Sequence, residues 1–314
     1  MTVSEAQDRF LSRRFGVFNH FLYGNPSDGA NELNAHAALD WDKCVSKLDV
    51  QKLAAQLHEV NAGYYIITLM QGSRHMLAPN STYDRIACTK PGEACPRRDL
   101  IGELAEALQK YDIDLFLYYT GDGPYLDPVI GPKFGLGNPR GKVTEQFVLN
   151  WASVLREYAL RYGDRIKGWW IDGCYREFLG YTDNLMQIYY DACKAGNPAA
   201  LVAMNDGIKP GFQKNFRDED FVCGEFEDFE VLPPARLIDG AQAHILAPLG
   251  CGQAANPRNR WRTRGARLSK ECLLDYVQRA NAAGMAVSID VFVDHSGAWD
   301  SDQMDVLKYL GAHI

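Results

Sequence analysis

Residues 168–173 read Gly-Trp-Trp-Ile-Asp-Gly, and this short stretch governs how the rest of the chain is interpreted. A bulky apolar run of this length is typical of a strand buried on both faces. Side chains alternate along a strand, so we expect Trp170 and Asp172 on one side and Trp169 and Ile171 on the other. A carboxylate ending a buried strand is costly unless it is paired or used. Asp172 is therefore the first candidate for chemistry, with a helix N-cap or a buried ion pair as the alternatives.

Seven further stretches have the same strand-like character. They are residues 14–23, 64–70, 114–120, 201–205, 221–226, 244–249 and 285–292. Apolar residues at helical spacing predict helices at residues 40–60, 99–110, 144–161, 183–194, 269–283 and 300–310. Ser269 is a plausible N-cap and Gly284 a stop signal for the fifth of these helices. Alternating strands and helices predict one (β/α)8 barrel domain over residues 1–314, in preference to a doubly wound open sheet.

The composition argues against several classes of function. The 314 residues carry a net charge of -7 without a basic stripe, so nucleic acid is not an expected partner. No apolar run approaches the roughly 20 residues of a membrane helix, and the first residues lack the features of a signal peptide. We therefore expect a cytoplasmic protein with mostly reduced cysteines, in which Cys88 and Cys95 are the pair to consider for a disulfide or a metal. A homo-oligomer is compatible with the sequence.

Polar side chains follow several of the predicted strands. In a barrel of this kind the carboxyl ends of the strands form the active site, and the polar residues there are His20, Gln71, Thr120, Asp172, Asn205, Glu225 and Asp290. Tyrosines and tryptophans accompany them, at Tyr23, Tyr118, Tyr119, Trp170, Tyr175 and Trp261. Two separated carboxylates among aromatic platforms suit glycoside hydrolysis, in which one attacks the anomeric carbon and the other protonates the departing oxygen.

The order and spacing of five segments are similar to those of a known family. The segments are residues 15–20 (FGVFNH), 62–68 (AGYYIIT), 98–100 together with 115–119, 158–173, and 288–297 followed by Gln303 and 307–311. Together they resemble the catalytic barrel of the α-L-fucosidases, glycoside hydrolase family 29. The fourth segment resembles the helix and strand that carry the family's nucleophilic aspartate, which maps to Asp172. The resemblance covers most of the chain and does not include the β-sandwich domain that many members append.

The resemblance implies a cofactor-free hydrolysis by double displacement with net retention. Asp172 would form the glycosyl-enzyme, and a glutamate would act first as general acid and then as general base. Residues 224–234 (GEFEDFEVLPP) contain three candidates for that glutamate. Glu225 is favoured because it ends a strand and follows a glycine, with Glu230 and Glu227 as alternatives. We expect a small carbohydrate or glycoside to contact His20, Gln71, Arg74, Tyr119, Trp170 and Asn205.

The chain departs from the family where the sugar would bind. The family's second strand runs into Lys-His-His-Asp-Gly-Phe, whereas residues 70–75 here read Met-Gln-Gly-Ser-Arg-His. Phe21 replaces the tryptophan that follows the histidine of the first strand. These departures leave the identity of the sugar open, and a related sugar or an altered pocket fits the sequence as well as fucose.

Two other functions and one further segment stay open at this point. A metal-dependent isomerase or epimerase would use Asp172, Glu225, Asp290 and either His20 or His295 as metal ligands. A barrel that binds carbohydrate without catalysis is the third hypothesis, motivated by the missing histidine pair. The segment 258–267 (RNRWRTRGAR) contains five arginines. It reads either as a solvated loop or as a site for an acidic group such as a sulfate or a uronate.

Overall fold

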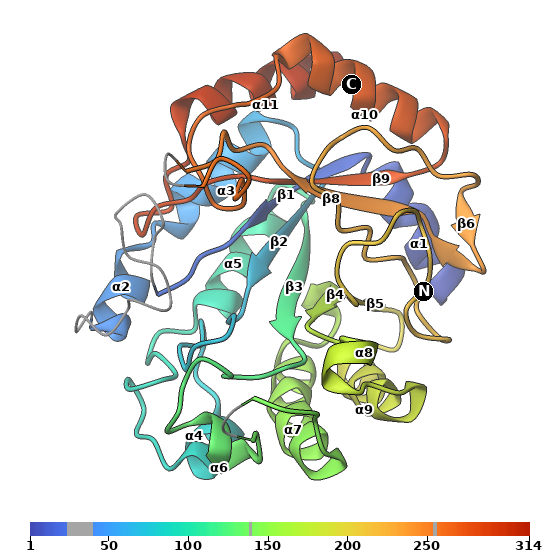
Figure 1. Ribbon diagram of the computed structural model, residues 1–314. Coiled ribbons are helices and arrows are strands. Elements are labelled where there is room, and N and C mark those ends of the chain that lie inside the picture. The colour runs from blue at the N-terminus through green and yellow to red at the C-terminus, as the bar shows by residue number, and fades with distance from the viewer. Residues whose placement is uncertain (24–39, 138–139, 254–255) are drawn as a thin grey trace.

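The computed structural model describes residues 1–23, 40–137, 140–253 and 256–314. Within these residues a curled, seven-stranded parallel sheet has the order β5-β4-β3-β2-β1-β9-β8 (Figure 1). The strands are β1 Phe15–Asn19, β2 Tyr64–Thr68, β3 Asp114–Thr120, β4 Ile166–Asp172, β5 Leu201–Met204, β8 His244–Pro248 and β9 Ala286–Asp290. A separate antiparallel ribbon pairs β6 Leu237–Ile238 with β7 Ala241–Gln242. The sheet and the helices between its strands confirm the predicted (β/α)8 barrel.

Helices surround the outer face of the sheet, with α10 and α11 on one side and α7 and α9 on the opposite side (Figure 1). The helices are α1 Val3–Ser12, α2 Trp41–Lys47, α3 Val50–Glu59, α4 Ser81–Ala87, α5 Leu100–Gln109, α6 Gly131–Phe134, α7 Glu145–Tyr162, α8 Arg176–Leu179, α9 Asp183–Lys194, α10 Lys270–Ala282 and α11 Ser301–His313, with a 3-10 turn at Gly163–Arg165. The hydroxyl of Ser269 caps α10 as predicted, accepting from the N–H of Cys272 at 3.2 Å. No helix in the described ranges is long and apolar enough to cross a membrane.

The predicted helix at residues 40–60 is in fact two helices, α2 and α3. The chain is extended at Leu48 (ψ 120°), and the carboxylate of Asp49 then accepts the N–H of Lys52 at 3.0 Å. An aspartate that bonds the backbone in this way favours a new N-cap over a continuing helix. The helical spacing of apolar residues therefore predicted one helix where the N-cap residue Asp49 separates two.

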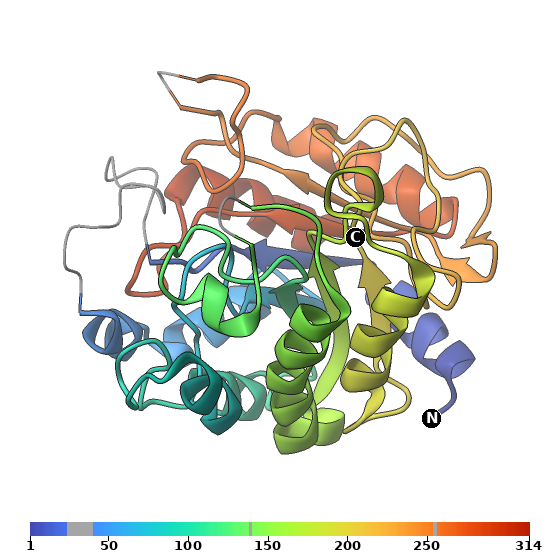
Figure 2. The same ribbon diagram turned by 60° about the horizontal axis from the view of Figure 1, so that its bottom comes forward.

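Helix α1 is an element that the sequence reading missed. Thr2 and Glu5 form a reciprocal capping box at its start, which is a recognisable signal for a helix N-terminus. The ring of Phe10 is 1% exposed and lies 4.9 Å from the ring of Tyr64 and 5.0 Å from that of Phe116. Arg9 binds Asp114 at the start of β3, so α1 closes the end of the barrel where the strands begin, apart from the other helices (Figure 2).

The sequence predicts a sixth strand at residues 221–226, and here the structure differs. Two isolated bridges, Phe221 to Gln242 and Glu225 to Leu246, connect this segment to its neighbours along β7 and β8. Gly224 between them has a left-handed φ of 58°, and a Cβ at that position would lie 1.8 Å from the carbonyl oxygen of His244. This backbone geometry interrupts the pleat, because an extended strand requires negative φ throughout.

Side chains take over part of the pairing between this segment and β5. The N–H of Val202 donates to the carboxylate of Asp220 at 2.9 Å, and the N–H of Met204 donates to that of Glu219 at 2.7 Å. Only the Asp220 N–H to Val202 carbonyl bond, at 2.9 Å, is backbone to backbone here. The segment therefore fills the sixth position of the barrel as an extended but irregular connection.

The side chains of the central strands alternate between two layers, as predicted. Trp170 belongs to the cluster inside the barrel, whereas Trp169 and Ile171 belong to the core between sheet and helices. Tyr118 and Tyr119 on β3 divide in the same way, with Tyr118 inside. The alternation brings one side of each strand end to the mouth of the barrel, where the candidate site lies.

Candidate active site

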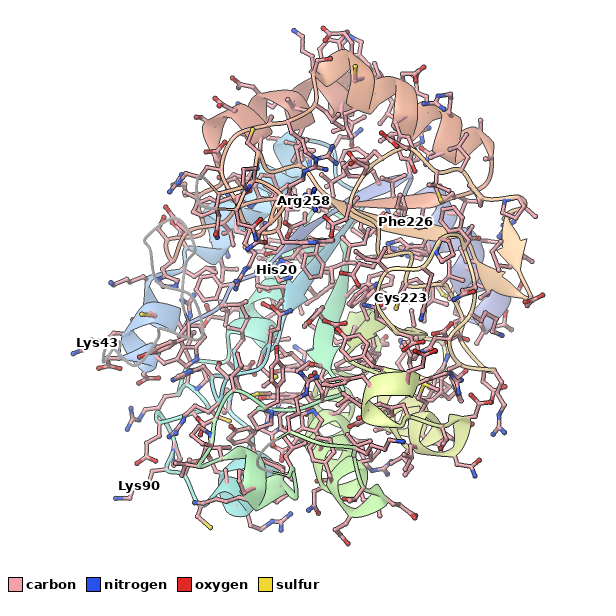
Figure 3. The ribbon with its side chains drawn as sticks, in the orientation of Figure 1. His20, Lys43, Lys90, Cys223, Phe226 and Arg258 are labelled. Atoms are coloured by element: carbon pink, nitrogen blue, oxygen red, sulfur yellow. The ribbon has the colours of Figure 1, made fainter. Side chains whose placement is uncertain are left out.

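A cavity of about 210 Å³ opens at the carboxyl ends of the strands. Asp172 from the end of β4 and Glu225 from the irregular sixth segment both line it. Three further predicted residues, His20, Gln71 and Trp170, line the same cavity. In Figure 3 His20 lies in the middle of the molecule, with Cys223 and Phe226 of the sixth segment to its right. The two carboxylates that the sequence places 53 positions apart therefore share one cavity.

A single amide group joins the two carboxylates. Nδ2 of Asn205, directly after β5, donates to Oδ1 of Asp172 at 2.8 Å and to Oε2 of Glu225 at 2.6 Å. The carbonyl Oδ1 of Asn205 accepts the N–H of Gly207 at 3.1 Å, which fixes the orientation of the amide. Because both bonds start from the same nitrogen, the distance between Oδ1 of Asp172 and Oε2 of Glu225 cannot exceed the sum of the two bond lengths.

Asp172 is held by three hydrogen-bond donors. Besides Asn205, the hydroxyl of Tyr118 donates to its Oδ2 at 2.5 Å and the N–H of Gly173 donates to its Oδ1 at 2.8 Å. Gly173 has φ 71°, and a Cβ there would lie 2.7 Å from the carboxyl carbon of Asp122. A glycine is thus required to turn its N–H back onto the carboxylate. The donors orient Asp172 and stabilise negative charge on it.

Glu225 has an environment that favours its neutral form. Burial, and next the negative charge of Asp172, raise the pKa of its carboxyl group well above the ordinary value, while the hydrogen bond from Asn205 acts in the opposite direction. One carboxylate surrounded by donors and a neighbouring carboxyl group with a raised pKa form an asymmetric pair. Such a pair can supply a base or nucleophile and an acid at the same pH.

His20 and Asp290 form a second polar pair at the mouth. Nδ1 of His20 lies 2.7 Å from Oδ1 of Asp290, and the two side chains are 8% and 1% exposed. The N–H of Arg262 donates to the other oxygen of Asp290 at 2.9 Å. These contacts fix the imidazole from β1 against a loop that follows β8. His20 can therefore present its other ring nitrogen to a ligand in the cavity.

Aromatic side chains form one wall of the cavity. The rings of Tyr118 and Trp170 stack with centroids 5.4 Å apart and an interplanar angle of 16°. His20 lies edge-on to Trp261 from the β8–α10 loop, at 6.0 Å between centroids. Flat apolar faces next to carboxylates suit the C–H faces of a pyranose ring.

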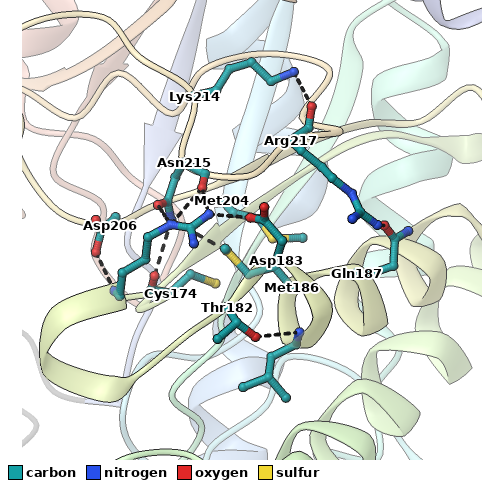
Figure 4. Close-up of polar contacts among 12 residues, drawn as sticks. Cys174, Thr182, Asp183, Met186, Gln187, Met204, Asp206, Lys214, Asn215 and Arg217 are labelled. Atoms are coloured by element: carbon teal, nitrogen blue, oxygen red, sulfur yellow. Dashed lines mark hydrogen bonds and ion pairs between the residues drawn. The ribbon is translucent and has the colours of Figure 1, made fainter.

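Hydrogen bonds from α8 hold the loop that follows β5 (Figure 4). The N–H of Arg176 donates to Asp206 at 2.8 Å, and its Nε donates to Oδ1 of Asn215 at 3.0 Å. Asn215 in turn donates to the carbonyl of Cys174, just after β4, at 3.3 Å. These bonds connect the segments that follow β4 and β5, so the spacing between Asp172 and Asn205 is supported on both sides.

Three predicted contact residues do not line the cavity: Asn205, which bonds to both of its acids, and Tyr119 and Arg74, which lie away from it. The side chain of Tyr119 is fully buried between sheet and helices, stacks on Trp151 and donates to its carbonyl at 3.1 Å. Strand alternation is the reason, since it directs Tyr118 inward and Tyr119 outward. Arg74, in the loop after β2, forms a bidentate pair with Asp127 in the loop after β3, one bond measuring 3.0 Å. Tyr118 therefore takes the place that the sequence analysis assigned to Tyr119.

The remaining predicted residues are placed as follows. Glu227 and Glu230 are exposed, whereas Glu225 lines the cavity. Cys88 is exposed, Cys95 is buried, and both are free, so the suggested disulfide is absent. His295 binds the carbonyl of Leu22 at 3.0 Å.

The metal-dependent alternative would use some of the predicted site residues as ligands. Within the described part of the chain, no group of three or more His, Cys, Asp or Glu side chains is arranged to hold a metal ion. Among the described residues, the side chains suggested as ligands for an isomerase do not form such a group, although His20, Asp172 and Glu225 line one cavity.

Residues of the β8–α10 loop are the part of the site that sequence reasoning missed. Asn259, Trp261 and Arg262 line the cavity together with the carboxylates. In the sequence this segment is conspicuous for its arginines, and Trp261 is one of several aromatic residues near the predicted site. No local pattern indicates that the loop folds back over the mouth of the barrel.

Comparison with solved structures identifies relatives of this fold. The α-L-fucosidase AlfC from Lactobacillus casei superposes with a TM-score of 0.68 at 18% identity, covering 98% of this chain and 97% of that chain. The chain has the fold of the fucosidase barrels. A family 29 α-L-fucosidase from Bacteroides thetaiotaomicron gives a TM-score of 0.70 at 17% identity, covering 98% of this chain and 72% of that chain.

A second group of structures shares the fold. The endo-fucoidan hydrolase MfFcnA4 of glycoside hydrolase family 107 gives a TM-score of 0.70 at 13% identity over 94% of this chain, which spans about half (52%) of the length of that protein. No protein-family profile and no curated sequence matches the chain. At these identities the likeness establishes the barrel and its similarity to the α-L-fucosidases in fold.

Proposed function

We propose that this protein is a retaining glycoside hydrolase that acts on α-L-fucosides or closely related glycosides. The observation that carries the proposal is the Asn205 amide, which donates to Asp172 at 2.8 Å and to Glu225 at 2.6 Å. These two bonds hold one oxygen of each carboxyl group closer to the other than the roughly 6.5–9.5 Å that inverting enzymes need, which supports the shorter spacing of about 5–5.5 Å found in retaining enzymes. The fold shared with α-L-fucosidases and endo-fucoidan hydrolases supports a fucose-like sugar as the substrate.

In the first step of the proposed reaction, an oxygen of Asp172 attacks the anomeric carbon of the sugar. The bond between that carbon and the glycosidic oxygen breaks, and the proton of Glu225 moves to the departing oxygen. The donors from Tyr118 and Gly173 hold the carboxylate for attack. In the second step a water molecule attacks the same carbon, gives its proton to Glu225 and releases Asp172. The products are the free sugar with its original anomeric configuration and an alcohol.

The stereochemistry of the first product tests this proposal. Hydrolysis of 4-nitrophenyl α-L-fucoside, followed by proton NMR in the first minutes before mutarotation, should show the α-anomer of L-fucose as the initial product. Each of two displacements inverts the anomeric carbon, so the net result is retention. Initial release of the β-anomer would contradict the roles given to the two carboxylates. A panel of other nitrophenyl glycosides of both anomers defines the sugar.

The pH dependence of hydrolysis is a further expected result. Burial and the charge of Asp172 raise the pKa of Glu225, so this acid keeps its proton above the usual glutamate value of about 4.3 and loses it only as the pH rises through the raised pKa. The alkaline limb of kcat/KM should therefore lie near neutral pH or above. The Asn205→Ala variant removes a hydrogen bond that lowers this pKa, so its alkaline limb should move to still higher pH, whatever the remaining activity. An alkaline limb near pH 5, or a shift to lower pH in the variant, would contradict the assignment of Glu225.

A further inference from the structure

The β8–α10 loop contains five arginines, of which three are engaged in holding the loop. Arg260 and Arg267 both bind the carboxylate of Asp228, the first at 2.7 Å. Arg264 lies 3.7 Å from the carboxylate of Asp300 and its guanidinium lies 4.0 Å from the centre of the Phe292 ring. Each of these three guanidinium groups therefore has a partner on the protein, with two of them sharing Asp228.

Arg262 differs from them in both position and partners. It lines the cavity that contains Asp172 and Glu225. Its Nη1 is buried and has no hydrogen-bond partner among the described residues. A guanidinium is always charged and all of its nitrogens are donors, so leaving the buried Nη1 without a partner costs free energy. An anionic ligand in the cavity would remove this cost.

The loop holds Arg262 in place through its backbone. Arg262 has φ 61°, a left-handed conformation that is uncommon for a residue with a side chain. Its N–H is bound to Asp290 at 2.9 Å, and the carbonyl of the next residue, Thr263, accepts from Gln303 at 2.8 Å. The hydroxyl of Thr263 donates to the carbonyl of Arg260 at 2.7 Å. Neighbouring contacts therefore maintain a strained conformation next to the site, which is typical of a functional position.

The charged side chains that line the cavity indicate the charge of the ligand that Arg262 would bind. Among the described residues that line the cavity, Arg262 is the one with a permanent positive charge. The partners of the two acids are Tyr118, Gly173 and Asn205 rather than this guanidinium. A neutral sugar does not require a cation, but an anionic sugar would be repelled by Asp172 unless a cation faced its charged group. Guanidinium binds sulfate and carboxylate oxygens in a two-pronged geometry.

We propose that Arg262 forms a subsite for an anionic substituent, a sulfate ester or a carboxylate, on the sugar that Asp172 and Glu225 act on. This inference rests on the proposed function, because it assigns the substrate class of the same cavity. Arg258 provides a matched comparison. It belongs to the same loop (Figure 3), is exposed, and is not among the residues that line the cavity.

The test compares neutral and anionic substrates of one series. The series consists of 4-nitrophenyl α-L-fucoside, its 2-, 3- and 4-O-sulfates, and 4-nitrophenyl α-L-galacturonide, which carries a carboxylate at C6. At least one anionic member should exceed the neutral fucoside in kcat/KM by tenfold or more, and its identity distinguishes sulfate from carboxylate. Arg262→Gln should lower that ratio at least tenfold, and Arg262→Lys should lower it less. Arg258→Gln should leave the ratio within twofold of the unmodified protein.

Two results would overturn the subsite. One is a preference for the neutral fucoside over every anionic member. The other is an equal loss on all substrates in Arg262→Gln, given a circular dichroism spectrum and melting temperature like those of Arg258→Gln. If no substrate is hydrolysed, the proposed function fails, and calorimetric titration with L-fucose, its sulfates and L-galacturonate then decides the subsite separately. Binding of an anionic sugar that Arg262→Gln abolishes and Arg258→Gln retains supports the subsite, and the lack of such binding rejects it.

Discussion

Replacing Asp172 with asparagine should lower kcat on an α-L-fucoside by roughly 10⁴-fold or more, the scale seen when a catalytic side chain is removed. The amide has the shape of the carboxylate but cannot form the covalent glycosyl-enzyme. The fold should survive, because Oδ1 can still accept from Gly173 and Asn205, and the hydroxyl of Tyr118 can rotate to accept from the new amide. Steady-state kinetics together with thermal unfolding of the same preparation measure both effects.

Azide provides the control for this experiment. The smaller Asp172→Gly variant leaves space beside the anomeric carbon, and azide in place of the carboxylate should form β-L-fucosyl azide from an α-fucoside with a good leaving group. The anomeric configuration of the azide reports that attack comes from the side of residue 172. Activity of Asp172→Asn within tenfold of the unmodified protein would end the proposed mechanism.

Replacing Glu225 with glutamine should have an effect that depends on the leaving group. Protonation of the departing oxygen is worth about 10²- to 10⁴-fold, so a disaccharide or methyl fucoside should lose activity on this scale. A 2,4-dinitrophenyl fucoside leaves without a proton and should lose far less in its first step. The raised pKa of Glu225, caused by burial and by Asp172, is consistent with a group kept ready as an acid.

The neighbouring glutamates are matched controls for Glu225. Glu227 and Glu230 belong to the same segment and are exposed. Glu227→Gln and Glu230→Gln should remain within twofold on every leaving group. If one of them reproduces the leaving-group dependence and Glu225→Gln does not, the acid has been assigned to the wrong residue.

The strands and their facing could be predicted from the sequence because alternation is a local property. In residues 168–173 the side chains two apart share a face, and this placed Trp170 and Asp172 correctly on the inside of the barrel. The same rule, applied to Tyr118 and Tyr119, would have selected Tyr118 as the inward residue. The barrel followed from the repetition of strand and helix, which also requires no knowledge of distant contacts.

The remaining features depend on contacts between segments far apart in the chain. At Gly224 the backbone has a left-handed φ and passes so close to the carbonyl of His244, 20 positions away, that no side chain fits, and the run of strand-forming residues is broken there. Arg74 resembles a contact residue in the sequence, but Asp127 from another loop removes it from the cavity. Asn205 could be placed at the mouth from the sequence because it follows a strand. Its bonds to both acids could not be predicted, because they depend on where the sixth segment lies.

The sixth segment joins the barrel through a few bonds rather than as a regular strand, and Glu225, the proposed acid, stands at the last of them. Carboxylates of Glu219 and Asp220 accept two N–H groups of β5, and the backbone after them meets β8 at an isolated bridge between Glu225 and Leu246. Insertions or deletions between residues 226 and 236 would therefore leave the strand register intact. Within such a scaffold the loop after the proposed acid could change in length and adapt the site to new aglycones while the barrel stays the same.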